Sequence, residues 1–469
     1  MSDREVARAV ESELQYSDII PFSRVWIAVD DGIVSLTGSV STLTAFEQAE
    51  DIAATVRGVR GIVNRIDVVA PDTEPSVLEQ RVAAALAGNS ATDQYEITID
   101  ASDAGIVTLD GTVDSWAERS LAETVTGTVR GVRSIQNRIA VDTSRVHRGP
   151  GEIDAEIDER LHWDARVDDS LIEILVRDGG RVTLSGTVGS LAEKRLAVEL
   201  AHVAGVQTVD ATHLEVEPWA QDDELRLGAA RDASDAEIER AIDKALAVDP
   251  RVAREDIDVI VTDNRAWLQG TVSTLTAWRA AESNARNTVG VEQTFNHLRV
   301  EPLMLADEEL AARATDALTS NDALAQHEIW IRADNGRVRV VGDVDNAEQY
   351  WLADELIANL RGVEEFVNDL TIRGEQPRFA GDAYMETPRL LLPRARASYD
   401  VLSDRTLHEA VESELFWSPF VDENEVGIDV ENGRVTLTGT VDSINEYVAA
   451  TDNAFEAGAE IVRNQLEIE

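Results

Sequence analysis

Cysteine is absent from this 469-residue sequence, which excludes disulfide bonds, thiolate metal sites and cysteine nucleophiles. Long apolar runs are absent too, because no stretch approaches the roughly 20 apolar residues that cross a bilayer. The N-terminal residues lead directly into an amphipathic helical pattern, without the basic and apolar regions of a signal peptide. These absences predict a soluble, cytoplasmic protein without a transmembrane segment.

Positive charge is also scarce. The chain has 42 basic side chains against 89 acidic ones, which gives a formal net charge of −47. Proteins that bind nucleic acid neutralise phosphates with Lys and Arg, so this composition predicts no nucleic-acid partner and a surface that repels anionic membranes. Hydrophobic residues still make up 43% of the chain, which is enough to form packed cores.

Nearly all of the positive charge is arginine, because Lys194 and Lys244 are the only lysines. A thermophile raises Lys and Glu together. An acidic excess with few lysines suits a protein in molar salt, where the screening length falls to about 3 Å. We therefore expect an acidic protein of a halophile, of the haloarchaeal type. The alternative is an ordinary acidic cytosolic protein.

One short pattern recurs six times along the chain. A strand pattern with an internal glycine occupies residues 33–40, 106–113, 181–188, 265–272, 337–344 and 434–441. The six central glycines are Gly38, Gly111, Gly186, Gly270, Gly342 and Gly439. Each lies on the core-facing phase of its strand, so we predict a structural role where backbone or a helix approaches closely.

The residues around each central glycine predict a small α+β unit. An aliphatic stripe with helical spacing comes first, as in residues 6–14. Two alternating segments follow, joined by a turn such as residues 30–32, and predict a β-hairpin. A capping residue such as Ser115 begins a second helix, which we expect to end at a second glycine such as Gly58. Each unit is thus α-β-β-α-β, with two helices on one face of a three-stranded sheet.

Six such tandem units account for nearly the whole chain. We number them 1 to 6 and expect them at residues 1–71, 75–143, 150–217, 233–302, 306–373 and 403–469. Residues 374–402 combine prolines with several arginines and predict a linker. Its positive charge indicates either a tether attracted to the acidic units or a motif that binds a partner.

Units 1 and 2 carry a recognisable motif, L-x-G-x-V followed by G-V-x-x-V-x-N-x-I or a close variant. In unit 1 its residues are Leu36, Gly38, Val40, Gly58, Val59, Val63, Asn64 and Ile66. This motif resembles the BON domain, named for bacterial osmotically inducible periplasmic proteins and nodulation proteins. Two units depart from it, because unit 3 has Asp210 one place early and unit 6 has Gly458-Ala459.

The resemblance implies a non-enzymatic module that binds phospholipid or other proteins at the envelope and is linked to osmotic stress or transport. The sequence agrees, since it contains no motif for catalysis, phosphate binding or zinc binding. We therefore predict no catalytic, cofactor-binding or metal-binding residues, and a repeat protein that binds a protein partner or a lipid surface. The alternative is a cytosolic K⁺ sensor or K⁺-binding protein. Asp30, Asp31 and Asp334 in the hairpin turns are candidate ligands for a hard cation, although turn chemistry already explains them.

Strand alternation places large apolar residues on the open side of the sheet in units 4 and 5. In unit 4 the core-facing phase passes through Leu268, so Trp267 and the neighbouring Ile260 point outward. In unit 5 the same reasoning leaves Trp330 and Val341 outside. We predict that these four outward residues form an interaction surface. The alternative is that the two faces pack against neighbouring repeats.

The net charge generates a prediction about salt. We predict that the melting temperature rises between dilute buffer and about 2 M KCl, because screening removes the self-repulsion of a strongly acidic chain. Thermal unfolding followed by circular dichroism at the two salt concentrations measures this. An unchanged melting temperature would contradict the assignment to a halophile.

Overall fold

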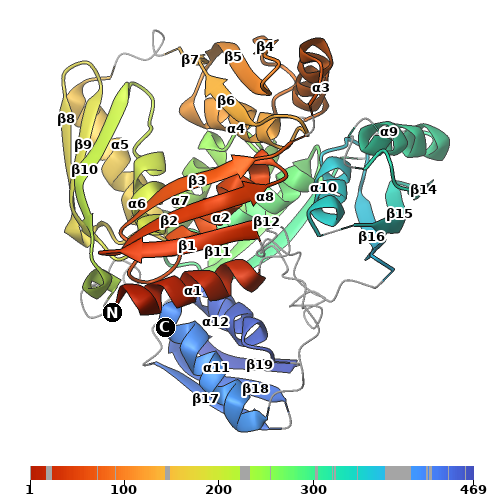
Figure 1. The fold of residues 1–469 in the computed structure, drawn as a ribbon. Helices are drawn as coiled ribbons and strands as arrows, with labels where there is room; N and C mark the ends of the chain where they lie inside the picture. The colour runs from red at the N-terminus through yellow and green to blue at the C-terminus, as the bar shows by residue number, and fades with distance from the viewer. Residues whose placement is uncertain are drawn as a thin grey trace.

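The computed structural model contains six α-β-β-α-β units in the predicted order, so the α+β fold is confirmed (Figure 1). It describes residues 2–16, 24–70, 72–89, 91–142, 148–221, 233–253, 255–301, 305–319, 321, 324–345, 347–374, 403–418, 421, 425–431, 433–441, 443–459 and 461–468. The predicted linker therefore lies outside the described residues, except for its first residue.

Units 1 to 3 make up the first half of the chain. Unit 1 contains α1 (Asp3–Tyr16), β1 (Val25–Asp30), β2 (Ile33–Val40), α2 (Leu43–Ala54) and β3 (Gly61–Val68). Unit 2 contains α3 (Pro75–Gly88), β4 (Ile97–Ala101), β5 (Ile106–Val113), α4 (Trp116–Gly127), β6 (Ser134–Asn137) and β7 (Ala140–Val141). Unit 3 contains α5 (Pro150–Trp163), β8 (Ile172–Arg177), β9 (Arg181–Val188), α6 (Leu191–Leu200) and β10 (Thr208–Val216).

Units 4 to 6 repeat this order. Unit 4 contains α7 (Asp235–Val248), β11 (Asp256–Thr262), β12 (Arg265–Val272), α8 (Leu275–Arg286) and β13 (Gln293–Val300). Unit 5 contains α9 (Asp307–Thr319), β14 (Trp330–Asp334), β15 (Arg337–Val344), α10 (Ala347–Ala358) and β16 (Glu365–Ile372). Unit 6 contains α11 (Asp404–Trp417), β17 (Val426–Glu431), β18 (Arg434–Val441), α12 (Ile444–Glu456) and β19 (Ile461–Ile468).

The second strand of each hairpin is the centre of its sheet. In unit 1 it pairs antiparallel with β1 and parallel with β3. The other units repeat this order, and in unit 2 the parallel strand is divided into β6 and β7. Leu36 on β2 and Leu14 on α1 are fully buried, because the helices cover this face of the sheet. Each core therefore lies between two helices and one face of the sheet, which leaves the other face open.

An aspartate at the start of the first helix holds the hairpin turn in four units. The Asp3 carboxylate accepts hydrogen bonds from the backbone N–H of Asp31 at 3.1 Å and of Gly32 at 3.0 Å. Asp31 and Gly32 have φ angles of 49° and 73°, as a tight hairpin requires. The equivalent aspartates are Asp235, Asp307 and Asp404.

The six central glycines lie inside strands, where the backbone at or just before the start of the first strand passes very close. A Cβ atom at Gly111 would lie 2.7 Å from the carbonyl oxygen of Glu96, and one at Gly342 would lie 2.8 Å from that of Glu328. Backbone rather than a helix therefore makes the close approach. The same approach is seen at Gly38, Gly186, Gly270 and Gly439.

One asparagine joins the last strand to the second helix in five units. Asn64 donates a hydrogen bond from Nδ2 to the Phe46 carbonyl at 3.1 Å, and its Oδ1 accepts one from the Ile66 N–H at 3.1 Å. The equivalent residues are Asn137, Asn296, Asn368 and Asn464. In unit 3, which has Asp210 instead, β10 contains an irregularity after that residue.

The second helix ends before the second glycine in units 1 to 5, so that part of the prediction is wrong. In unit 1, α2 ends with Thr55 as its C-cap, and Gly58 lies in a further turn with a φ of 89°. The extra turn places Val56 and Val59 in the core, where both are almost fully buried. Burial of these two valines explains why the helix unwinds early. In unit 6 the glycine follows the C-cap directly, as predicted.

The second helices of units 1, 2 and 3 meet in a closed ring, with the start of one helix against the end of the next. Thr44 of unit 1 donates a hydrogen bond from Oγ1 to the Gly127 carbonyl of unit 2 at 3.4 Å. Trp116 of unit 2 contacts His202 of unit 3, with ring centroids 4.6 Å apart. Arg195 in the first half of α6 pairs with Asp51 near the end of α2 at 3.1 Å, which closes the ring.

Ion pairs mark two equivalent contacts between units. Arg195 on α6 pairs with Glu50 and Asp51 on α2, the latter at 3.1 Å. Arg279 on α8 pairs with Asp354 on α10 at 2.5 Å. The two arginines hold the same position in their helices, as do Glu50 and Asp354. The contact of unit 4 with unit 5 therefore repeats that of unit 3 with unit 1.

Equivalent hydrogen bonds join units 1 to 3 with units 4 to 6. The N–H of Arg57 in unit 1 donates to the Trp417 carbonyl of unit 6 at 3.3 Å. The N–H of Val289 in unit 4 donates to the Trp163 carbonyl of unit 3 at 3.0 Å. Both donors directly precede the second glycine of their unit, and both acceptors end a first helix.

The same position in unit 5 is Arg361, which lies 3.9 Å from the Asp93 carboxylate of unit 2. Unit 1 is thus joined to unit 6, unit 3 to unit 4, and unit 2 to unit 5. The six units consequently form one packed body rather than separate domains on a string (Figure 1).

The contact between units 1 and 2 has an acid at both positions. The contacts of unit 3 with unit 1 and of unit 4 with unit 5 have an arginine at one position and an acid at the other. Glu47 holds the position of Arg195, and Glu123 holds that of Glu50. Burial, and then the charge of Glu123, raises the pKa of Glu47 to about 7. Between pH 4.5 and about 7, Glu47 is therefore protonated in the folded protein and ionised in the unfolded chain. The contribution of this site to the free energy of unfolding consequently falls as the pH rises through that range.

We predict that Glu47→Arg raises the free energy of unfolding at pH 8 by about 1 kcal/mol, because it places a guanidinium beside Glu123. The gain should shrink near pH 5, where Glu47 of the natural protein is protonated. Urea unfolding at the two pH values measures both effects. Glu11→Arg on the exposed side of α1 is the matched control, and an equal gain in that variant would contradict this account of the contact.

Candidate interaction surface

The predicted surface residues lie on the open faces of two separate sheets. Trp330 on β14 is 73% exposed, and Val341 lies directly opposite it on β15 and is 43% exposed. Ile260 on β11 is 46% exposed and pairs across the strands with Trp267 on β12. The described part of the chain leaves Trp330 uncovered, so this residue does not pack against another repeat.

Trp267 is half-buried because a neighbour on its own sheet covers one side of it. Its ring stacks on Phe295 of β13, with centroids 5.2 Å apart and planes 14° from parallel. Ile260, Trp267 and Phe295 therefore form an apolar row across all three strands of unit 4. The sequence analysis did not identify Phe295. Strand alternation could have placed it on the open face, because the neighbouring Thr294 faces the core and is buried.

Sequence reasoning also missed Trp26, which is 63% exposed on β1. It holds in unit 1 the position that Trp330 holds in unit 5, and the residue opposite it is Thr37. Its signal was the same alternation, because Val25 beside it is buried. Three of the six units therefore display a tryptophan on the open sheet face.

Units 4 and 5 meet through helices rather than sheets. Their contact runs through α8 and α10, where Arg279 pairs with Asp354. Leu275 at the start of α8 packs against the core of unit 5. The two apolar faces thus belong to different sheets and are not joined by this contact into one continuous patch.

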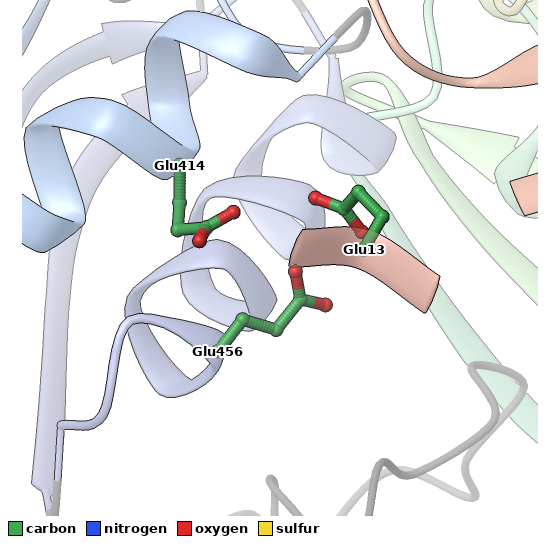
Figure 2. A group of neighbouring side chains, drawn as sticks. All are labelled: Glu13, Glu414 and Glu456. Carbon is green, nitrogen blue, oxygen red and sulfur yellow. The ribbon is translucent and has the colours of Figure 1, made fainter. Parts of the chain in front are cut away.

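Three glutamates converge where unit 6 meets unit 1. Glu13 on α1, Glu414 on α11 and Glu456 on α12 each place a carboxylate oxygen within 4.8 Å of the others (Figure 2). Glu13 and Glu414 hold the same position in their first helices. Carboxylate oxygens suit hard cations, but in a chain with 89 acidic residues such a cluster alone does not identify a bound ion.

The aspartates of the hairpin turns do not take part in that cluster. Asp31 points into solvent, with a side chain that is 93% exposed, and its backbone N–H binds Asp3. Turn geometry therefore accounts for Asp31. For Asp30 and Asp334 the role of cation ligand remains a hypothesis drawn from the sequence.

A cleft of about 1590 Å³ lies between units 2, 3 and 4. Two of its arginines pair with acids two residues away in the chain, Arg166 with Asp164 and Arg251 with Asp249, each at 2.6 Å. The charges of these two arginines are thereby compensated within the protein. We regard the cleft as part of the packing between units rather than as a ligand site.

Comparison with known proteins supports the family resemblance. The model of the BON domain matches residues 2–70, 76–143, 151–218, 234–302, 306–374 and 403–469. Osmotically-inducible protein Y of Escherichia coli (strain K12) is 27% identical over 147 residues, which cover 29% of this chain and 71% of that protein.

Similarity to solved structures is weak. CdsD, a structural protein of the type III secretion system of Chlamydia trachomatis, is 15% identical over 44% of this chain and 90% of that one, with a TM-score of 0.13. The periplasmic domain of PrgH from S. typhimurium is also 15% identical, over 49% and 99% of the two chains, with a TM-score of 0.11.

Among the helices that the structure describes, none is long and apolar enough to cross a membrane. The BON model matches each of the six units, and the matches cover most of the chain. The chain therefore belongs to the BON domain family, as a tandem array of six domains.

Proposed function

We propose that this protein is a non-enzymatic binding scaffold, in which the open sheet faces of units 4 and 5 hold a protein partner. The observation that carries the proposal is Trp330, which is 73% exposed beside the exposed Val341. Buried tryptophans dominate the energetics of many protein interfaces. Covering this pair with a partner removes apolar surface from water, which stabilises the complex.

The packing of the units supports the same proposal. Contacts between units run through helices, as at Arg195 and Arg279, so a partner reaches the sheets without separating the units. The faces therefore stay at fixed positions relative to one another. A fixed array of faces suits binding of an extended surface better than catalysis.

We extend the proposal to the setting in which the scaffold works. Its resemblance to osmotically-inducible protein Y suggests a link to osmotic stress, with transport or envelope association as further family roles. The net charge of −47 suits the cytoplasm of a halophile. K⁺ sensing is the separate alternative. Titration of the whole protein with KCl against NaCl at constant ionic strength distinguishes it from the scaffold.

The two tryptophans provide the test of the scaffold. We predict that Trp267→Ala combined with Trp330→Ala lowers the recovery of a partner from lysate in molar KCl at least about tenfold, because both rings lie on open faces. The radius of gyration should stay unchanged. Quantitative affinity capture and small-angle X-ray scattering measure the two quantities.

Thr436→Ala combined with Thr438→Ala, on the open face of unit 6, is the matched control and should retain the partner. Undiminished capture by the tryptophan variant would remove the proposed role. A larger radius of gyration in that variant would assign the tryptophans to packing instead.

A further inference from the structure

The open face of unit 5 carries positive charge beside its apolar pair. Arg332 on β14 lies directly opposite Arg339 on β15, and both side chains are exposed. On each strand the arginine is two residues from the apolar residue, Trp330 or Val341, so all four share one face. Over β14 and β15 the face thus presents an apolar pair and a cationic pair side by side, and β16 places Asp369 next to Val341 and Val367 next to Arg339.

The other five units lack this pair. At the position of Arg332 they carry Ala28, Asp100, Leu175, Ile260 and Asp429. At the position of Arg339 they carry Ser35, Thr108, Thr183, Trp267 and Thr436. The paired arginines are therefore specific to unit 5 and are not required by the BON fold.

The pair also works against the stability of the sheet, because like charges directly opposite each other repel. Arg339 is partly compensated by an ion pair with Asp369 on β16. Within the described residues, Arg332 forms no hydrogen bond or ion pair with an acidic side chain. The chain has 42 basic and 89 acidic residues, and yet two arginines lie opposite each other here.

We propose that the open face of unit 5 binds an acidic polypeptide segment in an extended conformation. An apolar side chain of the segment contacts Trp330 and Val341, and a carboxylate two residues along binds Arg332 and Arg339. Same-face residues of a strand are about 6.7 Å apart in both protein and ligand, so the two pairs match an apolar-x-acidic spacing. This inference rests on the proposed scaffold function and names the chemistry of its partner.

Molar salt favours this mode of binding. Screening over about 3 Å removes the long-range repulsion between an acidic ligand and a chain of net charge −47. Direct bonds from a guanidinium to a carboxylate persist at contact distance, and they are among the stronger hydrogen bonds in proteins. A nucleic-acid backbone or a lipid headgroup also carries negative charge. Neither places an apolar side chain one strand spacing from that charge, so neither matches both pairs of residues on this face.

Arg332→Glu separates a binding role from a structural one. The probes are peptides of about ten residues that alternate apolar residues with Asp, and the same peptides with Asn in place of Asp. We expect the full-length protein in molar KCl to bind the Asp peptides at least about tenfold more tightly than the Asn peptides. Arg332→Glu should abolish that preference. It should also raise the melting temperature, because it places an opposite charge across from Arg339.

Arg463→Glu makes the same change of charge on the open face of unit 6, where Arg463 is exposed on β19, and should keep the preference. Equal binding of Asp and Asn peptides, or no peptide binding above the Arg332→Glu background, overturns the inference. A lower melting temperature of Arg332→Glu also overturns it, because Arg332 would then be structural. Binding to vesicles of anionic lipid that depends on Arg332, without peptide binding, would assign the face to a membrane.

Failure of this inference is distinct from failure of the scaffold function. If the Trp267→Ala and Trp330→Ala changes abolish partner capture but Arg332→Glu does not, the scaffold stands and its partner is not held by acidic side chains. If the tryptophan changes leave capture intact, the scaffold itself fails.

Discussion

Two helices can cover only one face of a three-stranded sheet, and the arrangement of the whole chain depends on this constraint. A unit of this size buries a small core on its own, so further burial must come from its neighbours. The helices provide it, since units 1 and 3 share one hydrophobic cluster and Leu275 of unit 4 packs against unit 5. The sheets keep an exposed face because the helices make the contacts between units.

The contacts between helices use the same positions in each helix but different residues. The electrostatic energy of the contact therefore differs from one pair of units to another. Arg195 with Glu50 and Arg279 with Asp354 are attractive pairs at equivalent positions. Glu47 beside Glu123 is a like-charge pair at the same positions, and the pKa of Glu47 rises to about 7 as a result of burial and that charge. Duplication therefore conserved the interface shape while its electrostatics changed from unit to unit.

Features within a unit were predictable because their signals are local. The hairpin, the buried helix stripe and the exposure of Trp330 follow from alternation and turn chemistry over a few residues. The early end of α2 was not predictable from Gly58, because burial of Val56 and Val59 determines it. The helix cap at Ser115 was local as well, and in the structure Ser115 forms a full capping box with Glu118.

Contacts between units were beyond local reasoning. Arg195 and Glu50 are 145 residues apart, and nothing near either residue identifies the other. Trp26 had the same signal as Trp330 but was missed, because its opposite residue is Thr37 rather than an aliphatic one. The cationic pair of unit 5 becomes visible only when strand register places Arg332 across from Arg339.

The central claim is that helical contacts hold six units in one body, so that the open sheet faces have fixed positions. Small-angle X-ray scattering of the full-length protein in molar KCl tests this most directly. One packed body of this length predicts a radius of gyration of about 23 Å. A value about twice as large, with a scattering profile of separate domains on a string, would contradict the account.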